Sequence, residues 1–490
     1  MRIQKFGFVL FCFSLFASCS NNNDFKSDIK KDVTAQFLIK DGNISNLNPA
    51  DNWWLEFNDD VLNQLIDLGL KNNKDVQIAN LSIVTSRQLN NIDAAALFPS
   101  ASVSAGRQRF ASPGFGPRGV SYDIYQSTFD ATWELDFLGK NLDRYKAGKL
   151  RFLKEGQLYK ANVIRVTSEI AQNYIKLKST QKQIEDLEKI TALKNKLIDI
   201  AAQKEKNGSA SKVNIHNAEI SFTSSASDLV QARSDEKILT YKLAVLLGVT
   251  PDKILEILSK PSKNQIFDYS SGLVPVGLKS DILRRRPDII AAEYEIDAAV
   301  FEKSAQFKEF FPSFNLTAKI GGGSRDLGDV FKNGANVKDI RGAVSLPIFE
   351  AGSLIAQYKI SKAKAKVAVL DYERTVLSAL EECESQLVRY ANSLKIENNS
   401  NRALLASSKI LSINQNKKRF GVISTESLIS SQIQMLSNEI QLAQKKSDSL
   451  INLIALHKTI AGGFEGYELR FEKDRVLWVE KKITKENEQK

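Results

Sequence analysis

The residues FDATWELDF at positions 129–137 alternate between hydrophobic and polar side chains. Successive side chains of an extended strand point to opposite faces, so this alternation predicts a strand with one apolar and one polar side. The apolar side carries Phe129, Ala131, Trp133 and Leu135.

Three further segments alternate in the same way: SASVSAGRQR at 100–109, SFNLTAKIGGG at 313–323 and DIRGAVSLPIF at 339–349. We interpret the four segments as four strands in two hairpins. Each has about the 9 to 11 residues with which a tilted strand crosses a bilayer, so we predict that the apolar sides face lipid. In the last two segments these sides include Phe314, Leu316, Val344 and Leu346.

Most of the remaining chain has the pattern of long helices. No proline lies between positions 118 and 250 or after Pro347, so uninterrupted helices are possible there. Hydrophobic residues in the first of these segments follow the steps of three, four and seven that form a coiled-coil seam. The pattern predicts helices over 142–203 and 358–418, each about 90 Å long. The seam residues are Val163, Val166, Ile170, Leu177, Ile184, Leu187 and Ile198.

Each long helix is followed by a glycine-bearing turn, KNGSAS at 206–211 and RFGVIS at 419–424, and then by a second helical pattern. Glycine adopts the backbone conformation that such turns need, so we predict two long helical hairpins. A solenoid or a cytoskeletal coiled coil has a similar periodicity, but neither explains the interrupting strands.

The chain repeats itself at a fixed offset of 213 residues. FPS at 98–100 recurs at 311–313, and several isolated glycine, serine and acidic residues recur at the same offset. A constant offset held over so many positions indicates a duplication. The recurring pairs include Asp75 and Asp288, Gly139 and Gly352, Glu169 and Glu382, Gly208 and Gly421, and Ser211 and Ser424.

Four strands in one chain leave two open sheet edges. Unpaired backbone groups are not tolerated in the hydrocarbon of a bilayer, so strands of other copies must pair with these edges. Two copies would give eight strands, whose interior is filled by side chains, whereas three copies would give twelve strands around a lumen. We favour three copies.

The N-terminus reads as a secretion signal. MRIQKFGFVLFCFSLFASCS has a basic start, an apolar run from Phe6 to Phe16 and small residues before Cys19. This pattern resembles a bacterial lipoprotein signal, in which Cys19 becomes the first mature residue and carries lipid chains. An ordinary signal peptide that contains a cysteine is the alternative. No later stretch has 18 uncharged apolar residues, which a transmembrane helix would need. We therefore expect that any membrane-spanning segments are strands.

The composition excludes several other classes. The 490 residues are 43% hydrophobic, which excludes a disordered protein. The net charge of +11 is spread over helical segments among acidic residues, and no nucleic-acid-binding motif accompanies it. His216 and His457 do not correspond under the repeat, and neither has metal-ligand spacing. We predict no catalytic residue, no metal site, no cofactor and no nucleic acid partner.

These features divide the chain into six parts. They are a signal peptide at 1–18, a lipidated segment at 19–59, repeat one at 60–248, a linker at 249–272, repeat two at 273–462 and a charged tail at 463–490.

Several short motifs occur together in this frame. They are NWWLEFNDDVL at 52–62, LFPS at 97–100, FFPS at 310–313, WELDFLGK at 133–140, RRRPDII at 284–290 and SLPIFEAG at 345–352. Together they resemble the TolC-like outer membrane efflux proteins, in their lipoprotein branch, over nearly the whole mature chain. The resemblance implies a mainly helical homotrimer, in which long helical hairpins form an α-barrel continued by a twelve-strand transmembrane β-barrel.

The resemblance also implies the location and the partners. Such a channel is lipid-anchored in the outer membrane, extends into the periplasm and docks on a periplasmic adaptor and an inner-membrane pump of the RND type. It lets drugs or other solutes leave the cell. We predict that the two hairpin turns form the adaptor-docking surface, although they could equally serve the turn geometry alone. The docking residues are Gly208, Ser209, Ser211, Arg419, Gly421, Val422 and Ser424.

Two other functions remain open at this point. The same channel could serve type I protein or peptide secretion, and a periplasmic coiled-coil scaffold without a pore would share the helical pattern. The first turn departs from the family in having Glu205, Lys206 and Asn207 where an Arg-Tyr pair often precedes the glycine. This departure leaves the choice of adaptor open.

Overall fold

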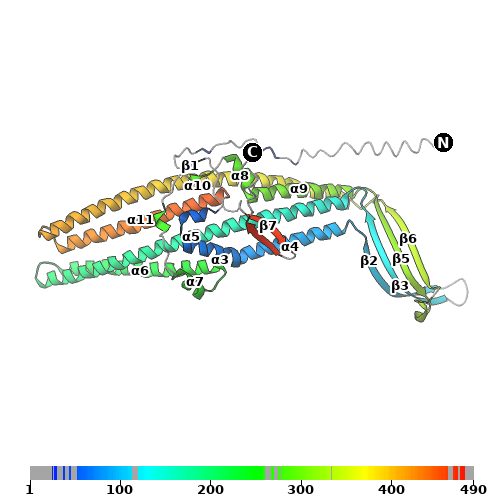
Figure 1. Cartoon of the computed structure of the whole chain (residues 1–490), viewed down its shortest axis with the longest axis horizontal. Coiled ribbons are helices and arrows are strands. Elements are labelled where there is room, and N and C mark those ends of the chain that lie inside the picture. The colour runs from blue at the N-terminus through cyan, green and yellow to red at the C-terminus, as the bar shows by residue number, and fades with distance from the viewer. Residues whose placement is uncertain are drawn as a thin grey trace. The chain divides into compact units, whose positions relative to one another are not determined.

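The computed structural model of the chain describes residues 25, 27–29, 37–38, 44–45, 52–112, 120–259, 266–269, 274–276, 279–332, 334–461, 467–472 and 475–480. The predicted signal peptide and Cys19 lie outside these residues. The described chain is mainly helical, with one four-stranded sheet (Figure 1). The larger helices are α3 (Asp60–Asn72), α4 (Lys74–Ala95), α5 (Lys140–Lys206), α6 (Lys212–Leu247), α9 (Pro287–Lys308), α10 (Ser353–Arg419) and α11 (Thr425–Thr459).

The chain forms two compact units. Described residues within 1–29, 82–156 and 291–375 make up the first unit, and those within 30–81, 157–290 and 376–490 make up the second. The first unit contains the sheet of β2 (Ser100–Ser112), β3 (Val120–Leu135), β5 (Ser313–Ser324) and β6 (Asn336–Ser345). The second contains both hairpin turns.

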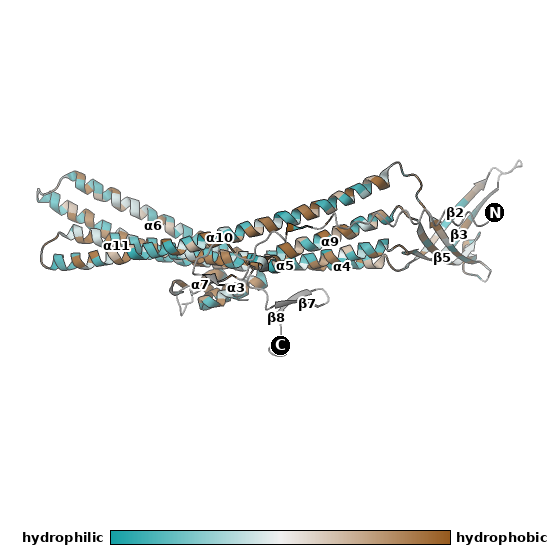
Figure 2. Cartoon of the chain, turned by 90° about the horizontal axis from the view of Figure 1, so that it is seen from above, coloured by the Kyte–Doolittle hydropathy of each residue, from teal (hydrophilic) through white to brown (hydrophobic). Residues whose placement is uncertain are grey.

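The two predicted long helices are confirmed as α5 and α10, which have 67 residues each. At 1.5 Å per residue each is about 100 Å long. Hydrophobic and hydrophilic residues are intermingled along them (Figure 2), as expected for helices with narrow buried seams. None of the described helices has the length and apolarity needed to cross a membrane.

The core of the second unit forms around the short helix α3. Asp59 caps this helix by accepting hydrogen bonds from the amides of Val61 and Leu62 at 2.9 and 3.0 Å, and the Tyr174 hydroxyl donates to the same carboxylate at 3.0 Å. Gly69 is buried against α5, since a Cβ placed there would lie 2.3 Å from Ile170 Cδ1. A side chain at this position would require the Ile170 side chain to move.

An arginine joins two acidic residues of the first repeat. Arg165 pairs with Asp75 at 2.8 Å and with Glu169 at 3.1 Å. Asp75 lies in the first turn of α4, whereas the other two residues lie on α5, so the arginine ties the start of one helix to the middle of the other.

The second repeat keeps the two acidic residues and changes the arginine. Arg286 pairs with Asp288 at 2.7 Å and with Glu382 at 2.9 Å. The position equivalent to Arg286 in repeat one is Asn73, and the position equivalent to Arg165 in repeat two is Ser378. The two repeats therefore retain the same tie between helices. In repeat one the arginine lies on the long helix α5, and in repeat two it lies just before the shorter helix α9.

The predicted linker and tail contain structure that the sequence reading missed. α7 (Pro251–Leu258) and the 3-10 helix η3 (Ile266–Asp268) lie within 249–272, with Ile254 and Ile266 buried. β7 (Tyr467–Glu472) and β8 (Arg475–Glu480) form an antiparallel hairpin within 463–490. Elements as short as these have too few residues to show a clear hydrophobic period.

A buried histidine lies at the end of α11. The His457 ring stacks on Trp53 with a centroid distance of 5.5 Å, and its Nδ1 has no hydrogen-bond partner among the described residues. Burial lowers the pKa of His457 to about 4, so the ring is neutral at pH 7. His457 therefore serves as an aromatic packing residue.

His457 should make the fold sensitive to acid. The unfolded chain binds the proton with a pKa near 6.5 and the folded chain only near 4, so folded-state stability is lost as the pH falls between these values. We expect His457→Phe to reduce the loss of unfolding free energy between pH 7.5 and 4.5 by about 2 to 3 kcal/mol. Thermal melts of the purified protein at both pH values measure this. His216→Phe, at an exposed position, is the control, and an equal acid sensitivity of His457→Phe and the unaltered protein would contradict the expectation.

Candidate functional site

The four strands form one antiparallel sheet in the order β2, β3, β5, β6 (Figure 1). Both predicted hairpins are present, and β3 pairs with β5 to join them. Directly paired residues of neighbouring strands lie on the same face of a sheet. Phe129 is paired with Val103 on one side and with Ile320 on the other, so an apolar row crosses three strands.

This row belongs to an apolar face. Trp133 is paired with Leu316, and Phe314 with both Leu135 and Val344. All the predicted lipid-facing residues lie in paired strands on this face except Leu346, which follows the end of β6 at Ser345. In the single chain the face is open to solvent: the exposed fractions are 76% for Val103, 81% for Ile340 and 65% for Val344.

The opposite face of the sheet is polar. Asp130 accepts hydrogen bonds from Ser104 and Thr128 and pairs with Lys319 at 3.5 Å. A hollow of about 520 Å³ lies over this face. Its lining includes Ser104, Gln108, Gln126, Thr128, Thr317, Lys319, Asp339 and Arg341. Over 129–135 and the segments paired with it, the sheet therefore separates an apolar side from a hydrogen-bonding side. Farther along the strands, Arg107 and Asp123 form an ion pair at 2.7 Å on the otherwise apolar side.

Three of the four strands are longer than predicted, with 13 residues in β2, 16 in β3 and 12 in β5. The first half of β3 was missed because Tyr122 lies on the polar face, where it stacks on Phe110 at 5.5 Å. Gly321 lies inside β5. A Cβ there would lie 2.1 Å from the Ser127 carbonyl oxygen, so the glycine permits close pairing with β3.

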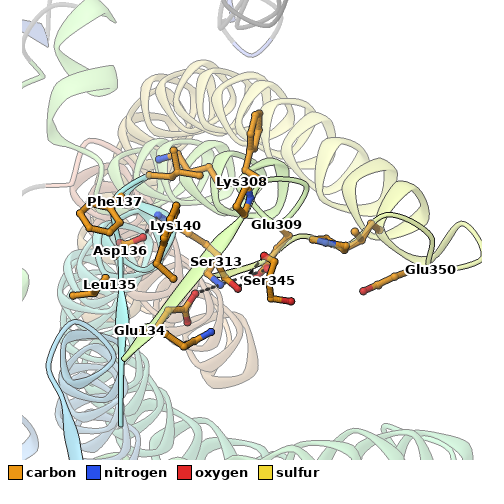
Figure 3. Close-up of a pocket in the computed structure, with 17 residues that line it drawn as sticks. Glu134, Leu135, Asp136, Phe137, Lys140, Lys308, Glu309, Ser313, Ser345 and Glu350 are labelled. Carbon is orange, nitrogen blue, oxygen red and sulfur yellow. Dashed lines mark hydrogen bonds and ion pairs between the residues drawn. The ribbon is translucent and has the colours of Figure 1, made fainter. Parts of the chain in front are cut away.

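The junction between β3 and α5 is fixed by capping (Figure 3). The Asp136 carboxylate accepts hydrogen bonds from the amides of Lys140 at 2.6 Å and Leu142 at 2.8 Å, which are free donors at the start of a helix. Gly139 supplies the turn with a φ of +73°, a conformation that glycine adopts without strain. The Trp133 indole N–H donates to the Leu97 carbonyl at 3.1 Å, which ties β3 to the chain that follows α4.

Ion pairs surround this junction. Lys140 pairs with Glu134 at 2.7 Å and Glu309 at 3.5 Å. Lys308 pairs with Asp143 at 2.6 Å and also donates to the Gly139 carbonyl at 3.0 Å. A cavity of about 310 Å³ is lined by four of these charged residues, Glu134, Lys140, Lys308 and Glu309 (Figure 3). The network ties the end of α9 to the start of α5 where β3 ends and β5 begins.

The equivalent junction between β6 and α10 is built differently. Gly352 repeats the left-handed conformation with a φ of +86°, and Ala351 also has a positive φ of +49°. Ile348 and Phe349 are 92% and 86% exposed. The second junction therefore has exposed apolar side chains, whereas the first junction has ion pairs.

The two hairpin turns have the same geometry. In the first, the amides of Gly208 and Ser209 donate to carbonyls three and five residues earlier at 2.9 Å each, and in the second Gly421 and Val422 repeat these bonds at 3.0 and 2.9 Å. Both glycines have a φ of +71°. The predicted docking residues of both turns are exposed; they are Gly208, Ser209, Ser211, Arg419, Gly421, Val422 and Ser424.

The serines at the turns also have a structural role. The Ser211 side chain accepts from the Val213 amide at 3.3 Å, and the Ser424 side chain accepts from the Ser427 amide at 3.2 Å, so each caps the helix that follows. Lys204 pairs with Glu426 at 2.5 Å and joins the two hairpins near their turns. The sequence reading did not find this ion pair, because the two residues have no equivalent pairing under the repeat.

The described residues contain no group of three or more His, Cys, Asp or Glu side chains placed to bind a metal ion. Cys383 is buried, and burial raises the pKa of its thiol to about 12, so the thiol stays protonated at neutral pH.

The model of the outer membrane efflux protein family matches this chain twice, over residues 65–249 and 278–462. Both ends of the second match lie 213 residues after those of the first, which is the offset of the repeat.

Individual relatives match over most of the chain. It is 27% identical over 417 residues to the toluene efflux pump outer membrane protein TtgC of Pseudomonas putida, covering 84% of this chain and 85% of that protein. It is 25% identical over 388 residues to a Salmonella typhimurium protein named "Probable outer membrane lipoprotein SilC", covering 75% and 82%.

The solved CmeC outer membrane channel of Campylobacter jejuni has the same fold. The TM-score is 0.79 at 24% identity, over 87% of this chain and 91% of that one. The resemblance predicted from the motifs is confirmed by two family matches and by relatives of similar length, and the chain belongs to the outer membrane efflux protein family.

Proposed function

We propose that three copies of this chain form the exit duct of a tripartite efflux system in the outer membrane. The strands of the three copies close one transmembrane wall, and the helical hairpins continue the passage into the periplasm. A periplasmic adaptor and an inner-membrane pump of the RND type deliver the solute. The two faces and two open edges of the four-stranded sheet carry this proposal.

The faces of the sheet suit a wall between lipid and water. An apolar face that is solvated in the single chain would be covered by lipid, and the polar face with Asp130, Lys319 and Arg341 would line an aqueous lumen. A sheet in a soluble domain would instead bury its apolar face against helices, and Val103 and Ile340 are not buried in the chain described.

The edges of the sheet require partners. β2 and β6 each pair on one side only among the described strands, and bilayer hydrocarbon offers no hydrogen bonds to the other side. Closure by three copies gives twelve strands, enough for a water-filled interior, whereas eight strands are filled by their own side chains.

The exposed turns suit the docking of an adaptor. Their outward surface includes glycine, serine and valine, which allow another helix to approach closely, and the second turn adds Arg419 as a polar contact. Lys206, Asn207 and Phe420, which is 83% exposed, also lie on this surface. The relative TtgC is named for toluene efflux. By analogy, the cargo of this channel is a small solute received from its pump.

The lipid anchor can be tested by metabolic labelling. Lipid attached at Cys19 should make this protein incorporate labelled fatty acid, and Cys19→Ala should abolish the label while trimers still form, because strands and helices hold the assembly. Cys383→Ala is the control and should keep the label. Persistent labelling of Cys19→Ala would contradict lipidation at this residue.

The assignment of the two faces can be tested with arginine. Phe129→Arg places a charge on the apolar face and should cost about 2 to 4 kcal/mol of stability in the membrane. Thr132→Arg lies three residues along the same strand on the polar face and should be tolerated. The yield of folded trimer in outer membranes measures both variants. Equal losses would show that the faces are wrongly assigned.

Adaptor docking can be tested at the turns. Ser209→Trp and Val422→Trp leave the turn glycines in place but fill the exposed surface, so each should reduce export while trimer yield and single-channel conductance stay normal. Resistance conferred on a strain that lacks its own channel measures export. Ser224→Trp, on an exposed part of α6, is the control. Full export by both turn variants would leave the small residues with a role in turn geometry alone.

A further inference from the structure

The two hairpins of the sheet have the same internal register. Ser100 is paired with Thr132 in the first hairpin, and Ser313 with Ser345 in the second, which is the same pairing shifted by 213 residues. One hydrogen bond is also repeated, because the Ser100 hydroxyl donates to the Thr132 carbonyl at 3.3 Å and the Ser313 hydroxyl to the Ser345 carbonyl at 3.4 Å. The hairpins are therefore two copies of one unit.

The chain also shows how one such unit joins the next. β3 of the first hairpin pairs with β5 of the second, with Leu135 opposite Phe314 and Ala131 opposite Ala318. The opposite join, from β6 to a following β2, cannot form within one chain because these strands are the two edges of the sheet. It can form only between copies.

We propose that β6 of one copy pairs with β2 of the next in the register of β3 with β5, shifted by the repeat. This inference rests on the three-copy assembly proposed above and specifies its interface. In a ring of six equivalent hairpins, every join has the same geometry. The paired residues between copies are then Val344 with Ala105, Leu346 with Val103, and Ile348 with Ala101.

The backbone of β6 is oriented for this pairing. The carbonyl of Ser345 receives the Ser313 hydroxyl, so Ser345 directs its backbone groups toward β5. Backbone direction alternates along a strand, so Val344, Leu346 and Ile348 direct their N–H and C=O groups to the open edge.

The open edge of β2 has backbone groups that can pair with those of β6. The Thr132 carbonyl receives the Ser100 hydroxyl, so Thr132 and its partner Ser100 direct their backbone groups toward each other. By the same alternation, Ala101, Val103 and Ala105 face the open edge of β2. Each proposed pair therefore brings together two residues whose backbone groups are available.

Pro347 also fits this register. A proline has no N–H and would break a ladder if that group faced the neighbouring strand. Pro347 has the orientation of Ser345 and points to the β5 side, where the pairing between β5 and β6 ends at Ser313 and Ser345. No hydrogen bond between copies is lost there.

The side chains support the same pairing. Val103, Leu346 and Ile348 are 76%, 52% and 92% exposed in the single chain. The register places Leu346 opposite Val103, so it extends the apolar row of Val103, Phe129 and Ile320 across the join. It places Ile348 opposite Ala101 on the same face. The segment after Ser345 is not a strand in the single chain, whereas its repeat equivalent at Trp133–Leu135 is a strand beside β5. Pairing between copies should therefore extend β6 to Ile348.

Other registers are less favourable. A shift by one residue would place Val103 opposite Ser345 or Pro347, on the wrong face, and would oppose backbone groups that point away from each other. A shift by two residues leaves the apolar side chains on the same face. However, the register between β6 and β2 would then differ from the register between β3 and β5. Six equivalent joins exclude such a difference.

Paired cysteines test the register. Val344→Cys with Ala105→Cys should form cross-linked dimers and trimers on oxidation, seen by denaturing electrophoresis. Ala131→Cys with Ala318→Cys has the same geometry within one chain and should cross-link without joining chains. Val344→Cys with Val103→Cys and Val344→Cys with Arg107→Cys report the two-residue shifts. Cys383 is buried, and the chain without added cysteines gives the background.

The expected result is that the pair at 344 and 105 joins chains faster than either shifted pair. Faster joining by a shifted pair, or no joining by any pair in protein that runs as a trimer, would overturn the register. Native mass spectrometry of the same samples separates this from failure of the proposed assembly, because particles of one chain only would reject the three-copy duct itself.

Discussion

The structure depends on a constraint that the bilayer places on strand edges. Inside hydrocarbon every backbone N–H and C=O group must find a partner within protein, and four strands in a row leave two edges without one. A soluble protein could cover such edges with a loop or a helix, but a lipid-facing wall cannot. The duct of this efflux family member therefore closes only when copies meet, so folding of the wall and assembly are the same event.

The duplication supplies the strands and the helices of the duct from one repeated unit. One unit, a strand hairpin followed by a long helical hairpin, occurs twice in the chain, and the same turn geometry recurs at Gly208 and Gly421. The two repeats of the chain differ where their surroundings differ. Ion pairs around Lys140 fix the first strand-to-helix junction within the chain, whereas Ile348 and Phe349 leave the second apolar and exposed, as suits a surface covered by a neighbouring copy.

The sequence predicted the periodic elements well and the contacts between distant residues poorly. The long helices, the glycine turns and the apolar face followed from periodicity, because a 3.6-residue or two-residue period survives wherever one side of an element is buried. The start of β3 was missed because Tyr122 and Ile124 occupy its polar face. The pairing of Arg165 with Asp75, the stacking of His457 on Trp53 and the Lys204–Glu426 pair join residues that are distant in sequence, and no local pattern marks such contacts.

We infer that the conducting unit is a closed ring of three chains. Purified protein can be separated by mass in detergent and each fraction reconstituted in a planar bilayer. We expect stable single-channel conductance from the fraction of three chains and none from single chains, since an open four-stranded sheet cannot enclose water. Conductance from single chains, or a non-conducting fraction of three intact chains, would contradict it.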